Sequence, residues 1–399
     1  MKVLILGSGL MGPAAAYNAM IDPDVSRVTL CDLNQQQLDA AQAKLSGMQG
    51  GEKLDTVVLV ISDEDAAAQL MADFDVVLGA LPLVLIPAEI RAAVAAKTPL
   101  VDLYFPVTVD AAGMAALRQQ VEAAGITVVL GGGVGSPGMT EMSARYLAEK
   151  LDRVDELYVR CGGIPENPKP PLNYKILFDG RQMPLEESDA SIVENGELKA
   201  VPRYSGTKSI FFSGVGECEE WLEDFPEWLL DMDIFKDLKY GAHTTIRWPG
   251  YAAKVTVLKE MGMLSEKPVE VDGVQVAPKS VLDAVLYPHV KMEEGERDIT
   301  LFRTEVKGEK DGQPRKYLFE TVDRYDDVLG FTSMARTTAF TGAIVSRMIA
   351  RGNLKATGMF MSEQAIFGSL FDTLLSELAV AGVRFTLTTE KVEPLGLTR

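Results

Sequence analysis

Residues 2–12 read KVLILGSGLMG, and this stretch decides how the first part of the chain folds. Its apolar start, residues 3–6, has no polar alternation, which is typical of a strand covered on both faces. The segment that follows fits the pattern G-x-G-x-x-G and leads into residues with helical spacing. Glycines at this spacing permit a tight turn, close approach of a pyrophosphate to the backbone, and close packing of helix on strand. We therefore expect a dinucleotide site formed by Gly7, Ser8, Gly9, Leu10, Met11 and Gly12.

An acidic residue, Asp32, closes the second apolar run twenty residues after Gly12. A carboxylate at this point can hold the ribose hydroxyls of a bound dinucleotide. It would also repel the 2′-phosphate of NADP, and the next residues, Leu33 and Asn34, offer no cation. The sequence therefore predicts NAD as the cofactor. The alternative is a glycine-rich turn in a fold that has lost its nucleotide.

Short apolar runs recur through the first 135 residues, with a helical pattern between each pair. The runs are residues 3–6, 28–31, 57–61, 76–78, 100–103 and 127–130. Strand and helix in this alternation predict a Rossmann-type α/β fold, with right-handed crossovers and a doubly wound parallel sheet.

Ligands of such sheets bind beyond the carboxyl ends of the strands. We therefore expect Asp63 near the adenine, and Leu81 and Pro82 near the nicotinamide side of the crevice. Asp102 closes the fifth strand and is a catalytic candidate facing the same crevice. Its alternative role is to cap a loop.

The alternation of apolar runs and helical patterns stops near residue 135, and an α+β region with a mostly antiparallel sheet is expected beyond it. Strand-like segments lie at residues 156–161, 174–178, 209–212 and 244–248, and a hairpin pairs residues 298–306 with 316–322. The acidic and aromatic run 217–225 favours a solvated amphipathic helix over a pocket lining. Residues 332–349 form a helix that returns the chain to the first sheet. These patterns predict a nucleotide-binding domain at 1–135, completed by about 330–399, and a substrate and dimerisation domain at 136–329.

Composition excludes several classes of protein. The chain has 399 residues, of which 47% are hydrophobic, and a net charge of −18. A surface this acidic repels phosphate backbones, so nucleic-acid binding is not expected. No stretch reaches the roughly 18 uninterrupted apolar residues of a membrane span. Three cysteines without metal or redox spacing and two histidines predict a cytoplasmic protein with no metal site.

Two segments beyond the first domain resemble the saccharopine dehydrogenase family. Residues 161–175 read CGGIPENPKPPLNYK, and residues 245–250 read TIRWPG, followed by Lys254 and Leu258. Residues 131–139 and the helix that starts near Met334 resemble further elements of that family. Within it the pattern is nearest to the L-lysine 6-dehydrogenase branch. One departure is Tyr251, because a histidine often follows the Pro-Gly pair in the lysine-oxidising branch.

The resemblance implies nicotinamide-dependent chemistry at a carbon–nitrogen bond of an amino acid, and a homodimer or higher homo-oligomer. The leading hypothesis is oxidation of the L-lysine ε-amine to a semialdehyde that cyclises to a piperideine carboxylate. One alternative is reductive condensation of saccharopine or carboxynorspermidine type, whose bulkier products would need further anchors such as Arg160, Arg203 or Arg336. An alternative of another class is a non-catalytic NAD-binding protein.

The implied chemistry needs a base for the amine and a cation for the substrate carboxylate. His243 suits the base, because the unperturbed pKa of histidine is about 6.5. Arg247 suits the carboxylate, with a structural ion pair as its alternative. Tyr174 and Lys175 belong to the family signature and are further catalytic candidates. Since neighbouring strand residues alternate faces, only one of these two is expected to point into the site.

Overall fold

The computed structural model describes residues 1–177 and 180–391. Contacts divide the chain into two compact units, which are described separately. Unit 1 comprises Met1–Met142 and Ala335–Arg384, and unit 2 comprises Ser143–Met334 and the residues from Phe385 onward.

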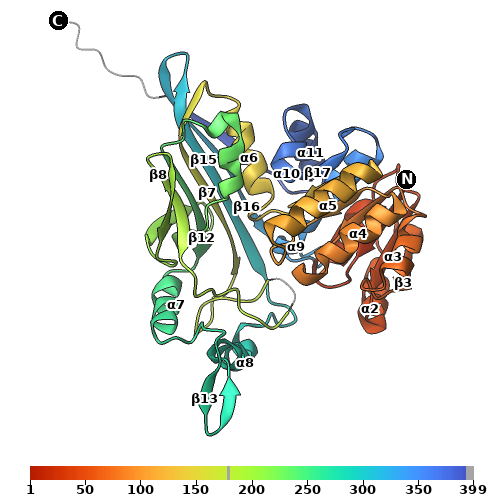
Figure 1. The fold of residues 1–399 in the computed structure, drawn as a ribbon, viewed down its shortest axis with the longest axis horizontal. Helices are drawn as coiled ribbons and strands as arrows, with labels where there is room; N and C mark the ends of the chain where they lie inside the picture. Colours follow the sequence, from red (N-terminus) through yellow and green to blue (C-terminus); the bar gives the residue numbers. More distant parts are fainter. Residues whose placement is uncertain (178–179, 392–399) are drawn as a thin grey trace, which may run out of the picture. The chain divides into compact units, whose positions relative to one another are not determined.

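Unit 1 is built on a parallel sheet of seven strands in the order β17-β6-β5-β4-β1-β2-β3 (Figure 1). The strands are β1 (Lys2–Leu6), β2 (Arg27–Asp32), β3 (Leu54–Val58), β4 (Val76–Gly79), β5 (Leu100–Asp102), β6 (Thr127–Leu130) and β17 (Gly358–Met361). In β1, Val3, Leu4 and Ile5 are fully buried, as the unbroken apolar run requires. The strand order reverses beside β1, between β1 and β4, which is where the crevice of a doubly wound sheet forms.

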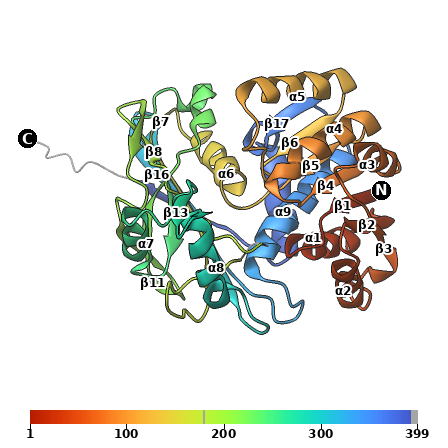
Figure 2. The ribbon, with the colours of Figure 1, turned by 60° about the horizontal axis from the view of Figure 1, so that its bottom comes forward.

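Helices cover both faces of this sheet. Figure 2 shows α3, α4 and α5 on one face and α1, α2 and α9 on the other. The helices are α1 (Met11–Met20), α2 (Gln35–Leu45), α3 (Glu64–Met71), α4 (Ile86–Ala96), α5 (Ala111–Ala124), α6 (Met139–Ala148), α9 (Ser333–Ala350), α10 (Ser362–Ala365) and α11 (Ser369–Val380). Of these, α6 runs from unit 1 into unit 2.

Two details of unit 1 differ from the sequence-based expectation. The third strand covers Leu54–Val58 instead of residues 57–61, because the chain leaves the sheet at Val60, which is 53% exposed. The chain returns from α9 through β17, which pairs in parallel with β6. Residues 385–391, part of the stretch that was expected to complete this domain, fall in unit 2 because β18 pairs there with β16.

Unit 2 contains a nine-stranded sheet with the main order β10-β11-β12-β7-β15-β16-β18, in which β8 also pairs with β12 and β9 pairs with β8. Neighbouring strands are antiparallel except for β12 and β7. The strands are β7 (Arg153–Pro165), β8 (Ala190–Glu194), β9 (Glu197–Val201), β10 (Lys208–Phe212), β11 (Gly216–Glu223), β12 (Tyr240–Arg247), β15 (Asp298–Lys310), β16 (Gln313–Arg324) and β18 (Thr386–Lys391). The unit also contains α7 (Tyr251–Glu260), α8 (Pro278–Val290) and the hairpin β13 (Val269–Val271) with β14 (Val274–Val276). Figure 1 shows this hairpin below α8, away from the large sheet of unit 2.

Two elements of unit 2 were interpreted wrongly from sequence. Most of the run 217–225 forms strand β11 and not a solvated helix, because Glu219 and Glu220 are buried and bonded to neighbouring elements. Glu220 pairs with Arg160 of β7, while Glu219 accepts backbone N–H groups at the start of α7. The expected strand at 174–178 is irregular, with a single bridge between Ile176 and Lys291, and Phe178 lies outside the described residues.

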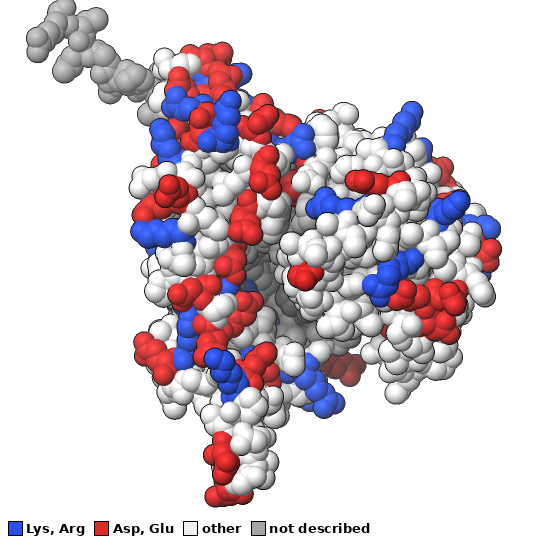
Figure 3. All heavy atoms as spheres, in the orientation of Figure 1, with Lys and Arg blue, Asp and Glu red and all other residues white. Residues whose placement is uncertain are grey.

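Across the described residues, no helix is both long and apolar enough to cross a membrane. The same residues contain no cluster of three or more histidine, cysteine, aspartate or glutamate side chains suited to a metal ion. On the face drawn in Figure 3, acidic and basic side chains are intermixed.

Candidate active site

The glycine loop of unit 1 lies between the end of β1 and the start of α1. Gly7 has a φ of +97°, a left-handed conformation that favours glycine, and its N–H donates to the Cys31 carbonyl at 2.7 Å. A methyl group on Gly12 would lie 1.9 Å from the Gly7 carbonyl oxygen, so only glycine lets α1 pack this closely. The loop therefore leaves backbone free of side chains where a pyrophosphate would approach the N-terminus of α1. These features fit a dinucleotide cofactor.

The Asp32 carboxylate fixes the end of β2 to this loop. Its Oδ2 accepts the Ser8 N–H at 2.7 Å, and its Oδ1 accepts the Asn34 N–H at 2.8 Å. Leu33, the next residue, is 67% exposed and uncharged. The carboxylate is thus held beside the phosphate loop, where a ribose would lie.

The remaining cofactor candidates separate into two groups. Leu81 follows β4 and approaches the loop, since its Cδ2 lies 3.4 Å from a methyl group placed on Gly7, and Pro82 comes next in the chain. Asp63 is the N-cap of α3 and accepts the Ala66 N–H at 3.1 Å. The Asp63 side chain therefore already caps the helix of the third crossover, between β3 and β4.

Asp102 is 2% exposed and closes β5 beside Gly79, the last residue of β4. Its Oδ1 accepts the Tyr104 N–H at 2.6 Å, so it does cap a loop. Its other oxygen faces Glu89 of α4, which is fully buried. Burial raises the pKa of Asp102, and burial together with repulsion from Asp102 raises the pKa of Glu89 well above its usual range.

In unit 2, Arg247 closes β12 and lies against three aromatic rings. Its guanidinium carbon is 4.6 Å from the ring centre of Tyr174, 5.9 Å from that of Tyr251 and 6.0 Å from that of Trp221. The rings of Trp221 and Tyr251 are stacked at 5.1 Å. The rings therefore hold the guanidinium plane through cation–π contacts in a largely dehydrated setting.

The hydrogen bonds of Arg247 are incomplete. Its Nη1 donates to the Ile246 carbonyl at 2.8 Å, and its buried Nε has no acceptor. No carboxylate pairs with it in the part of the chain that the structure describes, although Glu219 lies opposite it on β11. Glu219 instead accepts the N–H groups of Gly250 and Ala252 at 2.6 and 2.7 Å, which anchors α7. A buried arginine without an acid is suited to bind a carboxylate ligand.

Tyr174 and Lys175 point to different surroundings. Tyr174 contacts Arg247, its hydroxyl has no hydrogen-bond partner, and burial raises its pKa. Lys175 donates to the Lys291 carbonyl at 2.9 Å and pairs with Glu296 at 2.9 Å. The structure therefore brings Tyr174, but not the Lys175 ammonium, to the arginine.

His243 lies on β12 four residues before Arg247, and its Nδ1 is 3.0 Å from the Asp224 carbonyl oxygen. Four residues of strand span about 13 Å, so the imidazole and the guanidinium do not meet. The surroundings of Asp224 belong to another cluster, in which Arg203 pairs with Glu223, Asp224 and Glu186.

The other arginines considered as anchors in unit 2 already have acidic partners. Arg203 makes the three ion pairs just described, and Arg160 pairs with Glu220 at 2.7 Å. Arg203 is not free to take a ligand carboxylate without losing a buried partner, whereas Arg160 uses its Nε for Glu220 and keeps a buried Nη1 without an acceptor.

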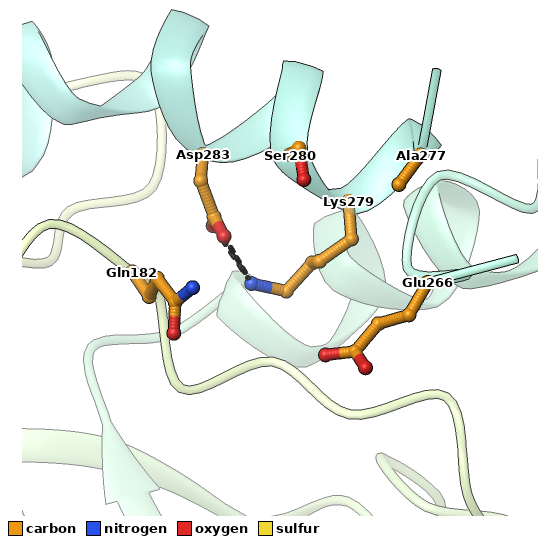
Figure 4. A pocket seen from close by; sticks show the side chains of 6 residues that line it. All are labelled: Gln182, Glu266, Ala277, Lys279, Ser280 and Asp283. Carbon is orange, nitrogen blue, oxygen red and sulfur yellow. Dashed lines mark hydrogen bonds and ion pairs between the residues drawn. The ribbon is translucent and has the colours of Figure 1, made fainter. Parts of the chain in front are cut away.

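A polar hollow of about 310 Å³ lies elsewhere in unit 2, beside α8. Figure 4 shows Lys279 and Asp283 pointing toward one another there, near Gln182 and Glu266. The Lys279 Nζ donates to both Asp283 carboxylate oxygens, at 2.8 and 2.6 Å, and to the Met183 carbonyl at 3.0 Å. Its donors are used in tying α8 to the segment around Met183, so the hollow is a structural feature.

Sequence reasoning missed four contributors to these sites. Glu89 lies within an apolar helical pattern, and only its burial distinguishes it from a surface acid. Trp221 and Glu219 were assigned to a helix, which hid their positions opposite Thr245 and Arg247. Tyr251 was noted as a departure from a family pattern, and its packing on Arg247 could not be read from the motif.

The parallel sheet with its strand-order reversal, the glycine loop and Asp32 together define a nicotinamide-dinucleotide oxidoreductase. Two family models account for most of the chain: "Saccharopine dehydrogenase NADP binding domain" matches residues 3–129, and "Saccharopine dehydrogenase C-terminal domain" matches residues 134–383. The chain belongs to the saccharopine dehydrogenase family.

Individual relatives are distant in sequence but cover nearly the whole chain. Carboxynorspermidine synthase of Vibrio alginolyticus is 25% identical over 394 residues, covering 91% of this chain and 92% of its own. Saccharopine dehydrogenase [NADP(+), L-glutamate-forming] of Saccharomyces cerevisiae is 23% identical, covering 90% and 93%. The solved structure of the apo histidine-tagged saccharopine dehydrogenase (L-Glu forming) from Saccharomyces cerevisiae covers 98% of this chain and 100% of its own, with a TM-score of 0.81 and 20% identity. That likeness supports the shared fold.

Proposed function

We propose that this protein is an NAD-dependent oxidoreductase that acts on a carbon–nitrogen bond of an amino acid carrying one anchored carboxylate. The observation that carries the proposal is Arg247, buried among aromatic rings without an acidic partner in the described residues. The cofactor would accept or donate a hydride at the carbon that bears the nitrogen. The glycine loop and Asp32 would hold it, with Leu81 and Pro82 beside the nicotinamide.

The choice of NAD rests on the residues that follow β2. The Asp32 carboxylate would sit where the 2′-phosphate of NADP has to go, and Leu33 supplies no positive charge. The matching family model is described as NADP-binding, so the cofactor preference of this chain is a proposal that differs from that description.

The substrate side of the reaction has two candidates. The first is a secondary amine made by reductive condensation of an aldehyde with an amine, which is favoured by the relatives named carboxynorspermidine synthase and carboxyaminopropylagmatine dehydrogenase. Arg160 and Arg203 already have acidic partners, which favours a product with one carboxylate over the three of saccharopine. The net charge of −18 would attract the cationic amine.

The second candidate is oxidation of the L-lysine ε-amine, which the same arginine would serve by binding the α-carboxylate. In the oxidation the ammonium must lose a proton to a base before hydride can leave its carbon, and in the condensation the amine must likewise be neutral before it attacks the carbonyl. His243 and Asp102 remain the candidates for that base. In the proposed oxidation the base takes one proton of the ammonium, and the hydride of the C–H bond then passes to NAD, which leaves a protonated C=N bond for water to hydrolyse.

Steady-state assays at the reduced-nicotinamide absorbance separate these candidates. The purified protein would be given NADH with an α-amino acid aldehyde and diamines of increasing length, and separately NAD with L-lysine. Consumption of NADH only when both carbonyl and amine are present supports the condensation. Reduction of NAD by lysine alone supports the second candidate, and no turnover in either direction, despite cofactor binding, contradicts the proposed function.

A further inference from the structure

Two acidic side chains of unit 1 are buried against one another where β4 and β5 end. Glu89 is completely buried, and Asp102 is 2% exposed. A methyl group placed on Gly79 would lie 2.4 Å from Asp102 Oδ2, and 2.5 and 2.6 Å from the two Glu89 carboxyl oxygens. Three acidic oxygens therefore crowd around a single point at the end of β4.

The pair has few other polar partners. Asp102 Oδ1 accepts the Tyr104 N–H, while Asp102 Oδ2 and both Glu89 oxygens have no hydrogen-bond partner outside the pair. In the part of the chain that the structure describes, no basic side chain acts on either group, and the titratable groups that face each other from α4 and β5 are these two acids. The negative charge of the pair is thus not neutralised by a neighbouring cation.

Two carboxylates cannot both stay ionised in such a site while no positive charge lies near them. Burial raises the pKa of both groups, and the charge of Asp102 raises that of Glu89 further. One proton held between them leaves a single negative charge and allows a charge-assisted hydrogen bond between the carboxyl groups. Such a pair titrates as one unit.

The pair lies close to the phosphate loop. Ala80 follows Gly79, and its carbonyl oxygen is 2.5 Å from a methyl group placed on Gly7. The pair is therefore at the carboxyl ends of the strands, beside the point where the strand order reverses. An oxidised nicotinamide ring carries one positive charge and a reduced ring none, so the charge near the pair depends on the form of cofactor that is bound. In a protein interior such a charge acts over several ångströms.

We propose that the Glu89–Asp102 pair is a proton site coupled to the charge of the bound nicotinamide ring. The pair keeps its proton when reduced cofactor binds and releases it when oxidised cofactor binds. The proposal rests on the nucleotide site of the proposed function, but it is independent of the amine substrate. Since release of a proton accompanies binding, the affinity for oxidised cofactor rises with pH, by up to about tenfold per pH unit, while that for reduced cofactor does not.

Isothermal titration calorimetry tests this without turnover. NAD and NADH would each be titrated in two buffers that differ in ionisation enthalpy, which counts the protons released on binding. The wild-type protein is expected to release up to one proton with NAD and none with NADH. In Glu89→Gln the amide has no proton to release and can still donate to Asp102, so the release with NAD is lost while NADH affinity stays within about twofold. Glu64→Gln, a change in an exposed acid of α3 paired with Arg91, should leave the proton count unchanged.

Few other groups of unit 1 could account for the release of a proton on NAD binding. Both histidines, His243 and His289, belong to unit 2, and burial raises the pKa of Cys31 beside Asp32 to about 12. Equal proton counts for the two cofactors, or a count retained in Glu89→Gln, would overturn the proposal. Should that variant not fold, infrared difference spectra of the wild-type protein replace it, and a protonated-carboxyl band that persists on NAD binding overturns the proposal equally. Failure of both cofactors to bind would remove the nucleotide function itself.

Discussion

The Asp32 carboxylate accepts two backbone N–H groups, from Ser8 and Asn34, and this fixes a negative charge beside the glycine loop. Its position follows from sequence spacing, but its two hydrogen bonds do not, since the conformation of the loop decides which N–H groups turn toward it. The bonds give the carboxylate a structural task in addition to any contact with a ribose.

A double change at this position should alter the cofactor preference. Asp32→Ser combined with Leu33→Arg removes the repulsion of a 2′-phosphate and adds a guanidinium on an exposed site. We expect the ratio of NAD to NADP affinity to fall by at least tenfold, measured by titration of protein fluorescence with each cofactor. Leu33→Met alone serves as the control and should leave the ratio unchanged. An unaltered ratio in the double variant would show that Asp32 does not select the cofactor.

Arg247 offers a second test at the scale of one residue. Arg247→Leu keeps the apolar contacts with the rings but removes the cation, so we expect KM for the carboxylate substrate to rise by about 10²-fold, as for loss of a charge-assisted bond of about 3 kcal/mol. Arg303→Leu is the matched control, because Arg303 is a half-buried arginine of the same sheet that pairs with Glu320 at 2.8 Å. Steady-state kinetics of both variants should show the KM effect only at Arg247. A similar rise in both would point to general damage to the sheet.

At the scale of an element, the contact between β1 and α1 depends on the absence of a side chain at Gly12. Gly12→Ala would place a methyl group 1.9 Å from the Gly7 carbonyl oxygen, a backbone atom that cannot move without shifting the loop. We expect at least a tenfold loss of NAD affinity and a destabilisation of about 1–3 kcal/mol, by calorimetry and urea unfolding. Gly47→Ala, which has no atom within 4 Å of the new methyl group, should change neither. Retained NAD affinity in Gly12→Ala would mean that the loop can shift to accommodate the methyl group without weakening cofactor binding.

The segment 174–176 is held to the chain after α8 by an ion pair. Glu296 accepts from Lys169, from the Glu293 N–H and from Lys175, and these contacts lower its pKa to about 2 despite partial burial. A depressed acid pKa contributes stability above the unfolded value of about 4.3, and this stability is lost as the pH falls toward 2. Glu296→Gln should therefore cost about 1–3 kcal/mol in urea unfolding at pH 7, with the difference shrinking below about pH 4. Glu293→Gln, in an exposed pair with Lys291, is the control, and a pH-independent difference at Glu296 would contradict the assignment.

Strands that alternate regularly with helices could be predicted, and those stabilised by partners distant in sequence could not. All six expected strands of unit 1 exist, because burial on both faces imposes an apolar run that is visible locally. In β11 the acids Glu219 and Glu220 resemble a solvated helix face until their partners Ala252 and Arg160 are known. The proximity of Trp221, Tyr251 and Arg247 likewise depends on sheet register, which the sequence does not state.

At the scale of the whole molecule, the chain passes between its two units three times, near residues 142, 334 and 384. The second segment of unit 1 is therefore placed by pairing of β17 with β6, and that of unit 2 by pairing of β18 with β16. The helical pattern at 332–349 indicates a return of the chain, whereas the last strand, TLTTEK, is mostly polar and gives no sign of its partner. Long-range pairing of this kind is the part of the fold that a local pattern leaves open.

The division of the chain into two units predicts where cofactor binding will stabilise the protein. A ligand at 100 times its Kd adds about 2.7 kcal/mol to the state that binds it, and the glycine loop, Asp32 and the Glu89–Asp102 pair all belong to unit 1. We expect NADH to slow amide hydrogen exchange most in β1, α1 and the ends of β2 and β4, because opening of these segments disrupts the nucleotide site at the glycine loop. Exchange measured by mass spectrometry with and without NADH checks this, with Gly12→Ala as the control in which the protection should largely disappear. Protection centred on β11 and β12 instead would place the nucleotide in unit 2 and contradict the proposal that the glycine loop of unit 1 binds it.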